Sequence, residues 1–256
     1  RGLGDVYKRQ ILAIVVGCFS KAVYIPFLAL YWLMPKDKFY SRRQKNLFKA
    51  GIFVLLILMF ASFILPLIGN VTSGAEVGDY RGGDTSQTSQ LSMILGYPLT
   101  YTGVLLKSLG TTFASYFIGS KVLANFAYRG IYDGIGYFVV LLTMLFTFVT
   151  DFGMTEKIYD AQMKRKILMM KIWNAVLIFG TACLVWTALY LDFTPVGSMV
   201  INGVSPRYYL PLIFPLSLIF INQKVRCSMK LENYQSLIAF LMLIGTGISI
   251  YCLMLA

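Results

Sequence analysis

Acidic side chains recur in the polar, glycine-rich stretch GAEVGDYRGGDTSQ, residues 74–87. Asp79 and Asp84 present hard oxygen atoms of the kind that bind divalent cations. Either carboxylate could instead act as a base on an acceptor hydroxyl. A solvated loop that binds nothing is the third interpretation. The stretch marks Asp79 and Asp84 as a candidate acidic loop with a divalent cation as one alternative, and we expect no resident metal or other cofactor.

Arg207 stands beside Tyr208 in INGVSPRYYLP, residues 201–211, where a polar loop gives way to an apolar run. An arginine is costly in hydrocarbon, so it must reach the headgroup region or pair with an anion. Its planar guanidinium suits phosphate oxygens. We therefore predict that Arg207 and Tyr208 contact a lipid phosphate. The alternative is a headgroup anchor without specificity.

Lys107 is the third candidate, within PLTYTGVLLKSLGTTF, residues 98–113. Helical spacing places Lys107 and Thr111 on one face of a helix. Such a lysine either extends its ammonium group to the membrane surface or contacts the phosphate of a substrate. Both interpretations stay open.

The chain has no histidine, which excludes histidine-based catalysis and histidine metal ligands. Its four cysteines form no CxxC pair and lie in or beside apolar segments, as small buried apolar side chains do. Any chemistry here must use carboxylates, arginine and tyrosine.

Composition indicates the surroundings in which these residues act. The 256 residues are 57% hydrophobic and 13% charged, whereas soluble domains have about 45–50% and about 25%. We predict an all-α polytopic transmembrane helix bundle of about six spans. The apolar runs are residues 11–34, 51–68, 136–150, 167–191, 208–222 and 237–255.

The Lys and Arg residues behind the net charge of +12 are unequally distributed among the loops between the apolar runs. The stretches 35–50, 151–171 and 223–235 hold fourteen Lys and Arg residues, whereas 70–133 and 192–208 hold five. The positive-inside rule makes the first set cytoplasmic and the second external. Residues 91–133 then cross the membrane either twice or not at all, and in the simpler alternative residues 92–120 form skimming or partly re-entrant helices on the external face. The charge is thus an orientation signal, and we expect membrane lipid rather than nucleic acid as a partner.

The ends of the chain carry a separate expectation. Residues 1–10, RGLGDVYKRQ, resemble the translation of a sequencing adapter, so we exclude them from the fold. Residues 11–256 form a single transmembrane domain, expected to be the C-terminal part of a longer protein.

A glycine pair is a candidate for helix packing. Gly130 and Gly134 are four residues apart, a spacing that permits close helix packing.

Three stretches together resemble a known family. They are KAVYIPFLALYWLMPKDKFYS (21–41), QLSMILGYPLTYTGVLLKSL (90–109) and INGVSPRYYLPLIFPL (201–216). Their order resembles the C-terminal half of bacterial polytopic membrane proteins called domain of unknown function 2142, or DUF2142. The resemblance covers most of residues 20–222.

That family is similar to the GT-C membrane glycosyltransferases, which take a sugar from a polyprenyl-phosphate carrier. The resemblance implies a place in the bacterial plasma membrane, a polyprenyl-phosphate sugar donor and a glycan acceptor. It matches Arg207 to the arginine of an "RYflP" motif, and Gln90 and Pro98 to the middle motif. Ser205 and Pro206 depart from the expected Gln and Gly. The family's acidic motif is N-terminal to all of these stretches, so the resemblance implies that the catalytic carboxylate lies outside this chain.

Two other functions remain as alternatives. A transporter or flippase of a lipid-linked substrate would have a polar pathway and inverted repeats, and we find no internal repeat. A non-catalytic membrane scaffold would have external loops without converging polar groups. Proximity of Arg207 to residues 79–107 would favour the enzyme.

Overall fold

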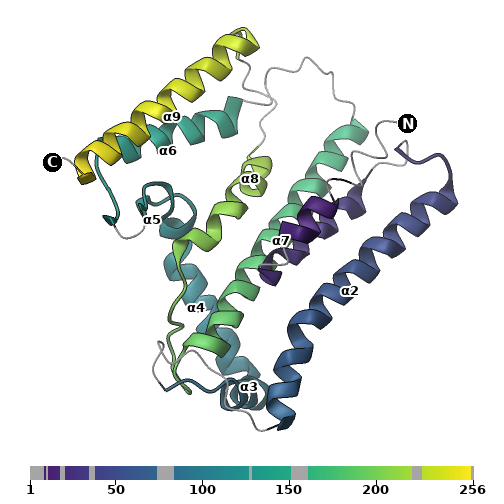
Figure 1. Cartoon of the computed structure of the whole chain (residues 1–256). Coiled ribbons are helices and arrows are strands. Elements are labelled where there is room, and N and C mark those ends of the chain that lie inside the picture. Colours follow the sequence, from purple (N-terminus) through teal and green to yellow (C-terminus); the bar gives the residue numbers. More distant parts are fainter. Residues whose placement is uncertain are drawn as a thin grey trace. The chain divides into compact units, whose positions relative to one another are not determined.

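The computed structural model describes residues 9, 11–17, 21–34, 38–73, 84–126, 129–150, 161–220 and 227–254 (Figure 1). Helices make up the regular structure of these residues, apart from one isolated bridge between Asn125 and Ile131. The predicted all-α class is confirmed. The helices are η1 (Ala22–Leu33), α2 (Arg42–Ser73), α3 (Gln87–Gly96), α4 (Pro98–Phe117), α5 (Ser120–Leu123), α6 (Ile135–Thr150), α7 (Ala161–Phe193), η6 (Pro206–Tyr209), α8 (Leu210–Ile219) and α9 (Leu231–Met254).

The chain divides into two compact units, each described by itself below. Unit 1 comprises Arg1–Leu109 and Val176–Val204. Unit 2 comprises Gly110–Ala175 and Ser205–Ala256. The helices α4 and α7 therefore contribute one part to each unit.

Three of the described helices are long and apolar enough to cross a membrane: Arg42–Asn70 of α2, Lys164–Phe193 of α7, and α9. At about 1.5 Å per residue, the 24 residues of α9 extend for about 36 Å, more than the hydrocarbon thickness of about 30 Å. The predicted count of six spans is not confirmed. Among the described residues, η1 and α6 are shorter apolar helices.

Of the predicted span 208–222, the structure describes residues 208–220, and ten of these are α-helical, those of α8. They extend for about 15 Å, half of the hydrocarbon thickness. Pro211 lies at the start of this helix and Pro215 inside it. Because proline has no N–H to donate, Pro215 removes one hydrogen bond of the helix.

The segment predicted to skim the external face, residues 92–120, is also broken. It contains the end of α3, all of α4 and the first residue of α5, with Tyr97 between the first two helices. Although α4 has twenty residues, it is not among the three helices apolar enough to span. Its place at the membrane surface stays a prediction.

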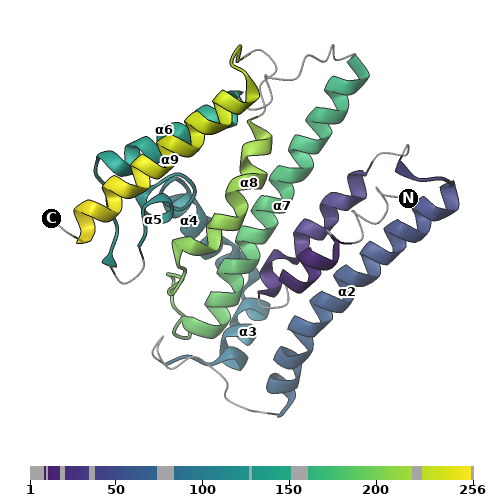
Figure 2. The same ribbon diagram turned by 45° about the horizontal axis from the view of Figure 1, so that its top comes forward.

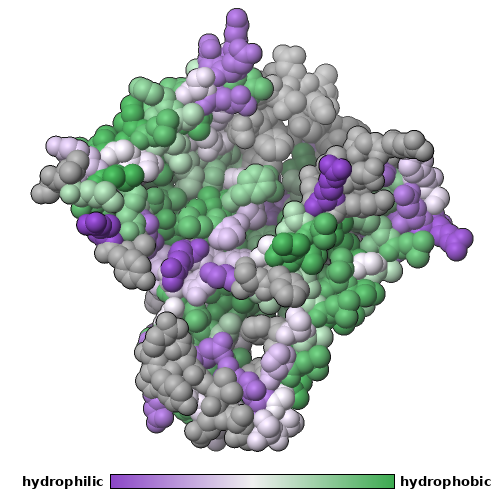
Figure 3. All heavy atoms as spheres, in the orientation of Figure 1, coloured by the Kyte–Doolittle hydropathy of each residue, from purple (hydrophilic) through white to green (hydrophobic). Residues whose placement is uncertain are grey.

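In unit 1, η1 packs along α2 (Figure 1). The contact centres on Ile25, Leu28 and Met59, each less than 10% exposed. Away from this contact, α2 exposes large apolar side chains such as Leu58 and Leu65. Figure 3 shows hydrophobic side chains over much of one face, with hydrophilic side chains in separate patches. Such surfaces suit a lipid environment better than water.

In unit 2, α6 and α9 lie side by side along their lengths (Figures 1 and 2). A Cβ atom added to Gly136 would come within 2.5 Å of the Gly245 carbonyl oxygen and would also meet the Ser249 side chain. At the other end, the Thr150 and Tyr234 hydroxyls share a hydrogen bond of 2.8 Å. The two helices are therefore antiparallel and touch at the backbone, the arrangement that small residues allow in membranes.

The predicted glycine pair is not the one used. Gly130 lies in the loop before α6 with φ of +102°, and Gly134 precedes the helix, against the Tyr132 ring. Their spacing of four residues has no helical meaning because neither is in a helix.

Candidate functional site

Gln90 is the centre of the polar contacts in unit 1. Its side chain is fully buried in α3. The Nε2 group donates to the carbonyls of Tyr190 at 3.2 Å and Pro195 at 3.3 Å. The Oε1 atom accepts from the Gly197 N–H at 3.2 Å. All three partners lie about a hundred residues further along the chain. The hydrogen bonds of Gln90 therefore connect α3 to the end of α7 and to the loop that follows α7.

This loop, residues 194–204, folds back on the end of α7. The buried Thr194 hydroxyl donates to the Leu189 carbonyl at 3.1 Å and accepts from the Asn202 N–H at 3.1 Å. Gly203 has φ of +80°, a left-handed conformation that favours glycine. A Cβ atom there would also meet the Phe193 ring. The INGV part of the sequence motif thus forms a tight return that leads to Ser205.

A second chain of polar groups reaches a carboxylate at the same end of α7. The Gln87 Nε2 group donates to Asp192 Oδ1 at 2.5 Å. The Gln87 Oε1 atom accepts from Asn70 Nδ2 at 3.3 Å. The amide of Gln87 therefore connects α2, α3 and α7. Asp192 was not among the predicted site residues.

Aromatic and hydroxyl groups continue this contact along α4. The Tyr101 and Thr187 hydroxyls are 2.5 Å apart and share a hydrogen bond. The Tyr101 ring lies against that of Tyr190, with centroids 5.1 Å apart. Burial raises the pKa of the Tyr101 phenol, so it stays neutral well above pH 7. The hydrogen bonds of Gln87 and Gln90 thus connect the two predicted external segments, 70–133 and 192–208, within the parts of them that belong to unit 1.

In unit 2, the short helix η6 carries the predicted arginine. Arg207 is exposed and Tyr208 is partly buried. Tyr209 is only 2% exposed, and its ring makes edge contacts with Tyr116 and Phe117, at centroid distances of 5.4 and 4.8 Å. Pro206, a departure from the family pattern, takes the first helical position, where a missing N–H costs least. The buried tyrosine therefore anchors the turn from which Arg207 projects.

A polar contact inside the apolar part of unit 2 holds α8. The buried Asn174 side chain of α7 donates through Nδ2 to the Pro215 carbonyl. Among the described residues, its Oδ1 atom is buried without a hydrogen-bond partner. In membrane proteins, buried polar side chains of this kind form hydrogen bonds between helices. Neither Asn174 nor its partner carbonyl was predicted, because an asparagine within an apolar run does not reveal which carbonyl it meets.

The predicted site residues fall in different parts of the structure. Lys107 is exposed on the unit 1 part of α4. Asp84 is exposed just before α3, and its carbonyl accepts from the Val196 N–H at 3.4 Å. Arg207 and Tyr208 belong to unit 2, and Asp79 lies outside the described residues.

The arrangement defines the chemistry available. Unit 1 offers a carboxylate, Asp192, with an amide partner, and unit 2 offers an exposed guanidinium on an anchored turn. A guanidinium of this kind binds phosphate oxygens. Within the described residues, no group of three or more His, Cys, Asp or Glu side chains could hold a metal ion.

Comparison with known proteins identifies the family. A family model described as "Predicted membrane protein (DUF2142)" matches residues 8–216. This range includes Gln90, Lys107 and Arg207, and it ends within α8. No curated protein and no solved structure matches the chain. The match covers most of the 256 residues and agrees with the three membrane-length helices, so the chain belongs to the DUF2142 family of predicted membrane proteins.

Proposed function

We propose that this chain is part of a GT-C-like membrane glycosyltransferase that transfers a sugar from a polyprenyl-phosphate carrier to a cell-surface glycan acceptor. The reaction takes place at the outer face of a bacterial plasma membrane. Membership of a membrane protein family and the three membrane-length helices support this proposal. The observation that carries it is the exposed Arg207, two residues before the buried Tyr209, in the turn η6 that directly precedes the apolar helix α8.

In this reaction the bond between the anomeric carbon and the carrier phosphate oxygen breaks. The electron pair stays on the phosphate oxygen, and the acceptor hydroxyl oxygen bonds to the anomeric carbon while a base takes its proton. Negative charge therefore grows on the leaving phosphate, which is where a fixed guanidinium contributes most. Arg207 fills this role, and the neighbouring Tyr208 offers a further polar group to the phosphate or its sugar.

The test compares variants of Arg207 in the full-length protein in native membranes. We expect Arg207→Ala to lower sugar transfer from a radiolabelled polyprenyl-phosphate hexose by about a hundredfold, the effect of losing one donor to a developing oxyanion. Arg207→Lys keeps the charge but loses the planar fork, so it should recover only part of the rate.

Arg129→Ala is the matched control, because Arg129 is an exposed arginine of the same unit, in the loop between α5 and α6. This variant should retain the parental rate. Surface polysaccharide and carrier turnover that are unchanged in Arg207→Ala would refute the proposed role.

A further inference from the structure

Unit 2 contains an apolar cavity of about 220 Å³. It lies among the end of α4, the second half of α6 and the end of α8. Its lining is hydrocarbon and aromatic throughout and includes Phe113, Ala114, Phe117, Phe148, Val149 and Phe220. None of these side chains offers a hydrogen bond to a ligand.

The lining of this cavity offers water no polar partner. An apolar cavity of about 150 Å³ in a soluble protein stays dry and accepts small hydrocarbons, because water there finds no polar partner. The cavity of unit 2 is larger than that. A hydrocarbon ligand therefore suits this lining better than water does.

The cavity can also be reached from the surroundings of the protein. Phe113 and Phe220, which line it, are 56% and 54% exposed. Ile118, Leu145 and Val149 are each more than a third exposed. In a membrane protein, the medium that meets such side chains is lipid.

We infer that this cavity binds a single acyl chain of a bilayer phospholipid. With no polar group in its lining, it recognises hydrocarbon as a class and not a headgroup. Occupancy then follows mass action, and the most abundant hydrocarbon in the membrane is the phospholipid acyl chain. The inference is separate from the proposed sugar transfer, because η6 does not line the cavity.

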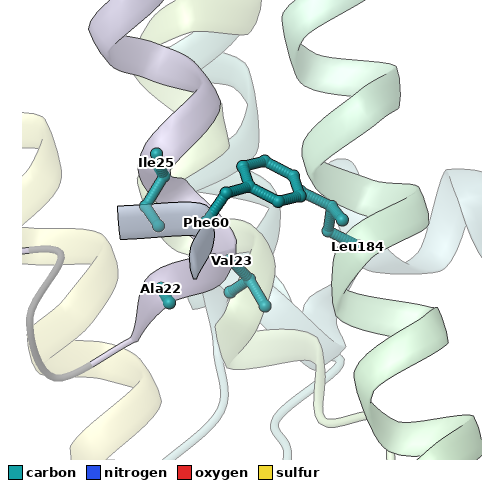
Figure 4. A pocket seen from close by; sticks show the side chains of 5 residues that line it. All are labelled: Ala22, Val23, Ile25, Phe60 and Leu184. Carbon is teal, nitrogen blue, oxygen red and sulfur yellow. The ribbon is translucent and has the colours of Figure 1, made fainter. Parts of the chain in front are cut away.

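A second cavity, in unit 1, has the wrong dimensions for this role. Its volume is about 20 Å³, close to that of one water molecule. Figure 4 shows the apolar side chains that line it, which come from η1, α2 and α7: Ala22, Val23, Ile25, Phe60 and Leu184. It serves as an internal comparison site that an acyl chain should not label.

Photolabelling tests the inference. The full chain is placed in phosphatidylglycerol nanodiscs that contain a trace of the same lipid with a diazirine near the end of one acyl chain. After irradiation, mass spectrometry of the digest locates the adducts. We expect adducts concentrated on the cavity residues of α4, α6 and Phe220, in excess of those on lipid-facing Leu243, which is 73% exposed. Adducts spread evenly over lipid-facing side chains would overturn the inference.

Two variants change the cavity in opposite directions. Ala114→Trp fills it and should lower labelling of the Phe148 segment by about fivefold or more, because the indole takes the space of the chain. Phe220→Ala enlarges it and should raise labelling. Leu243→Trp on α9 makes a comparable change at a lipid-facing position and should leave cavity labelling unchanged. Unaltered labelling in both cavity variants would contradict the proposal.

Competition identifies the source of the chain. Added phosphatidylglycerol should reduce labelling only in proportion to its share of the lipid. If a trace of polyprenyl phosphate displaced the probe, the cavity would be selective for the carrier, and the phospholipid assignment would be wrong. Loss of sugar transfer in Arg207→Ala is a separate result, so each proposal can fail without the other.

Discussion

Replacement of Gln90 by leucine tests whether the amide in α3 holds the loop after α7. Leucine is similar in size and apolar, so it preserves packing but offers no hydrogen bond. The change leaves two carbonyls and the Gly197 N–H without the partner that Gln90 provides. A buried hydrogen bond contributes about 1 kcal/mol net, so three lost bonds cost about 3 kcal/mol.

The effect should be local, because all three bonds involve residues 190–197. Amide hydrogen exchange measures local opening directly. Since 1.4 kcal/mol corresponds to a factor of ten, protection of the Gly197 amide should fall by about a hundredfold in Gln90→Leu. The α6–α9 pair of unit 2 should keep the exchange rates of the parent protein.

Gln235→Leu is the matched control, since Gln235 is exposed on α9. It should leave exchange at Gly197 unaltered. Gln90→Glu separates hydrogen bonding from packing, because a carboxylate keeps an acceptor but turns oxygens towards two carbonyls. It should weaken protection at least as much as leucine does. Parental protection of Gly197 in Gln90→Leu would refute the reasoning.

Two further predictions concern unit 2. Gly136→Val should destabilise the α6–α9 contact by about 1–3 kcal/mol, because its Cβ meets backbone atoms of α9, whereas Gly247→Val, with open space around it, should be nearly neutral. Thermal unfolding in detergent measures both, and equal midpoints would contradict the close contact. Asn174→Leu should change stability by less than about 1 kcal/mol, because the lost bond to Pro215 is offset by removal of a buried oxygen that has no partner among the described residues. Asn174→Asp should be strongly destabilising in the same assay, and a tolerated aspartate would show that Oδ1 is solvated.

Hydropathy predicted the three longest helices but not their ends. The predicted span 51–68 belongs to α2, which begins nine residues earlier at Arg42. The apolar run marks the part that lipid can surround, whereas a helix continues through a basic interface as long as its backbone bonds form. The run 208–222 shows the opposite difference, because its described residues 208–220 include only the ten α-helical residues of α8, with two prolines among them.

The sequence marks Arg207 as a candidate, but only the structure shows how its turn is built. Arg207 is exposed, its contact with a lipid phosphate stays a prediction, and Pro206 occupies the first helical position of η6. The hydrogen-bond partners of Gln90 could not be predicted, because no sequence pattern identifies backbone carbonyls a hundred residues away. The same holds for Asp192, whose amide partner Gln87 is 105 residues distant.

The contact between α6 and α9 bears on where a working protein can be truncated. The family match stops at residue 216, before α9 begins at Leu231. A chain cut there would lack α9. It would therefore lose the close backbone contact of Gly136 with Gly245 and the hydrogen bond between the Thr150 and Tyr234 hydroxyls. The folded unit therefore extends beyond the part that identifies the family, because α9, as far as Met254, packs on α6.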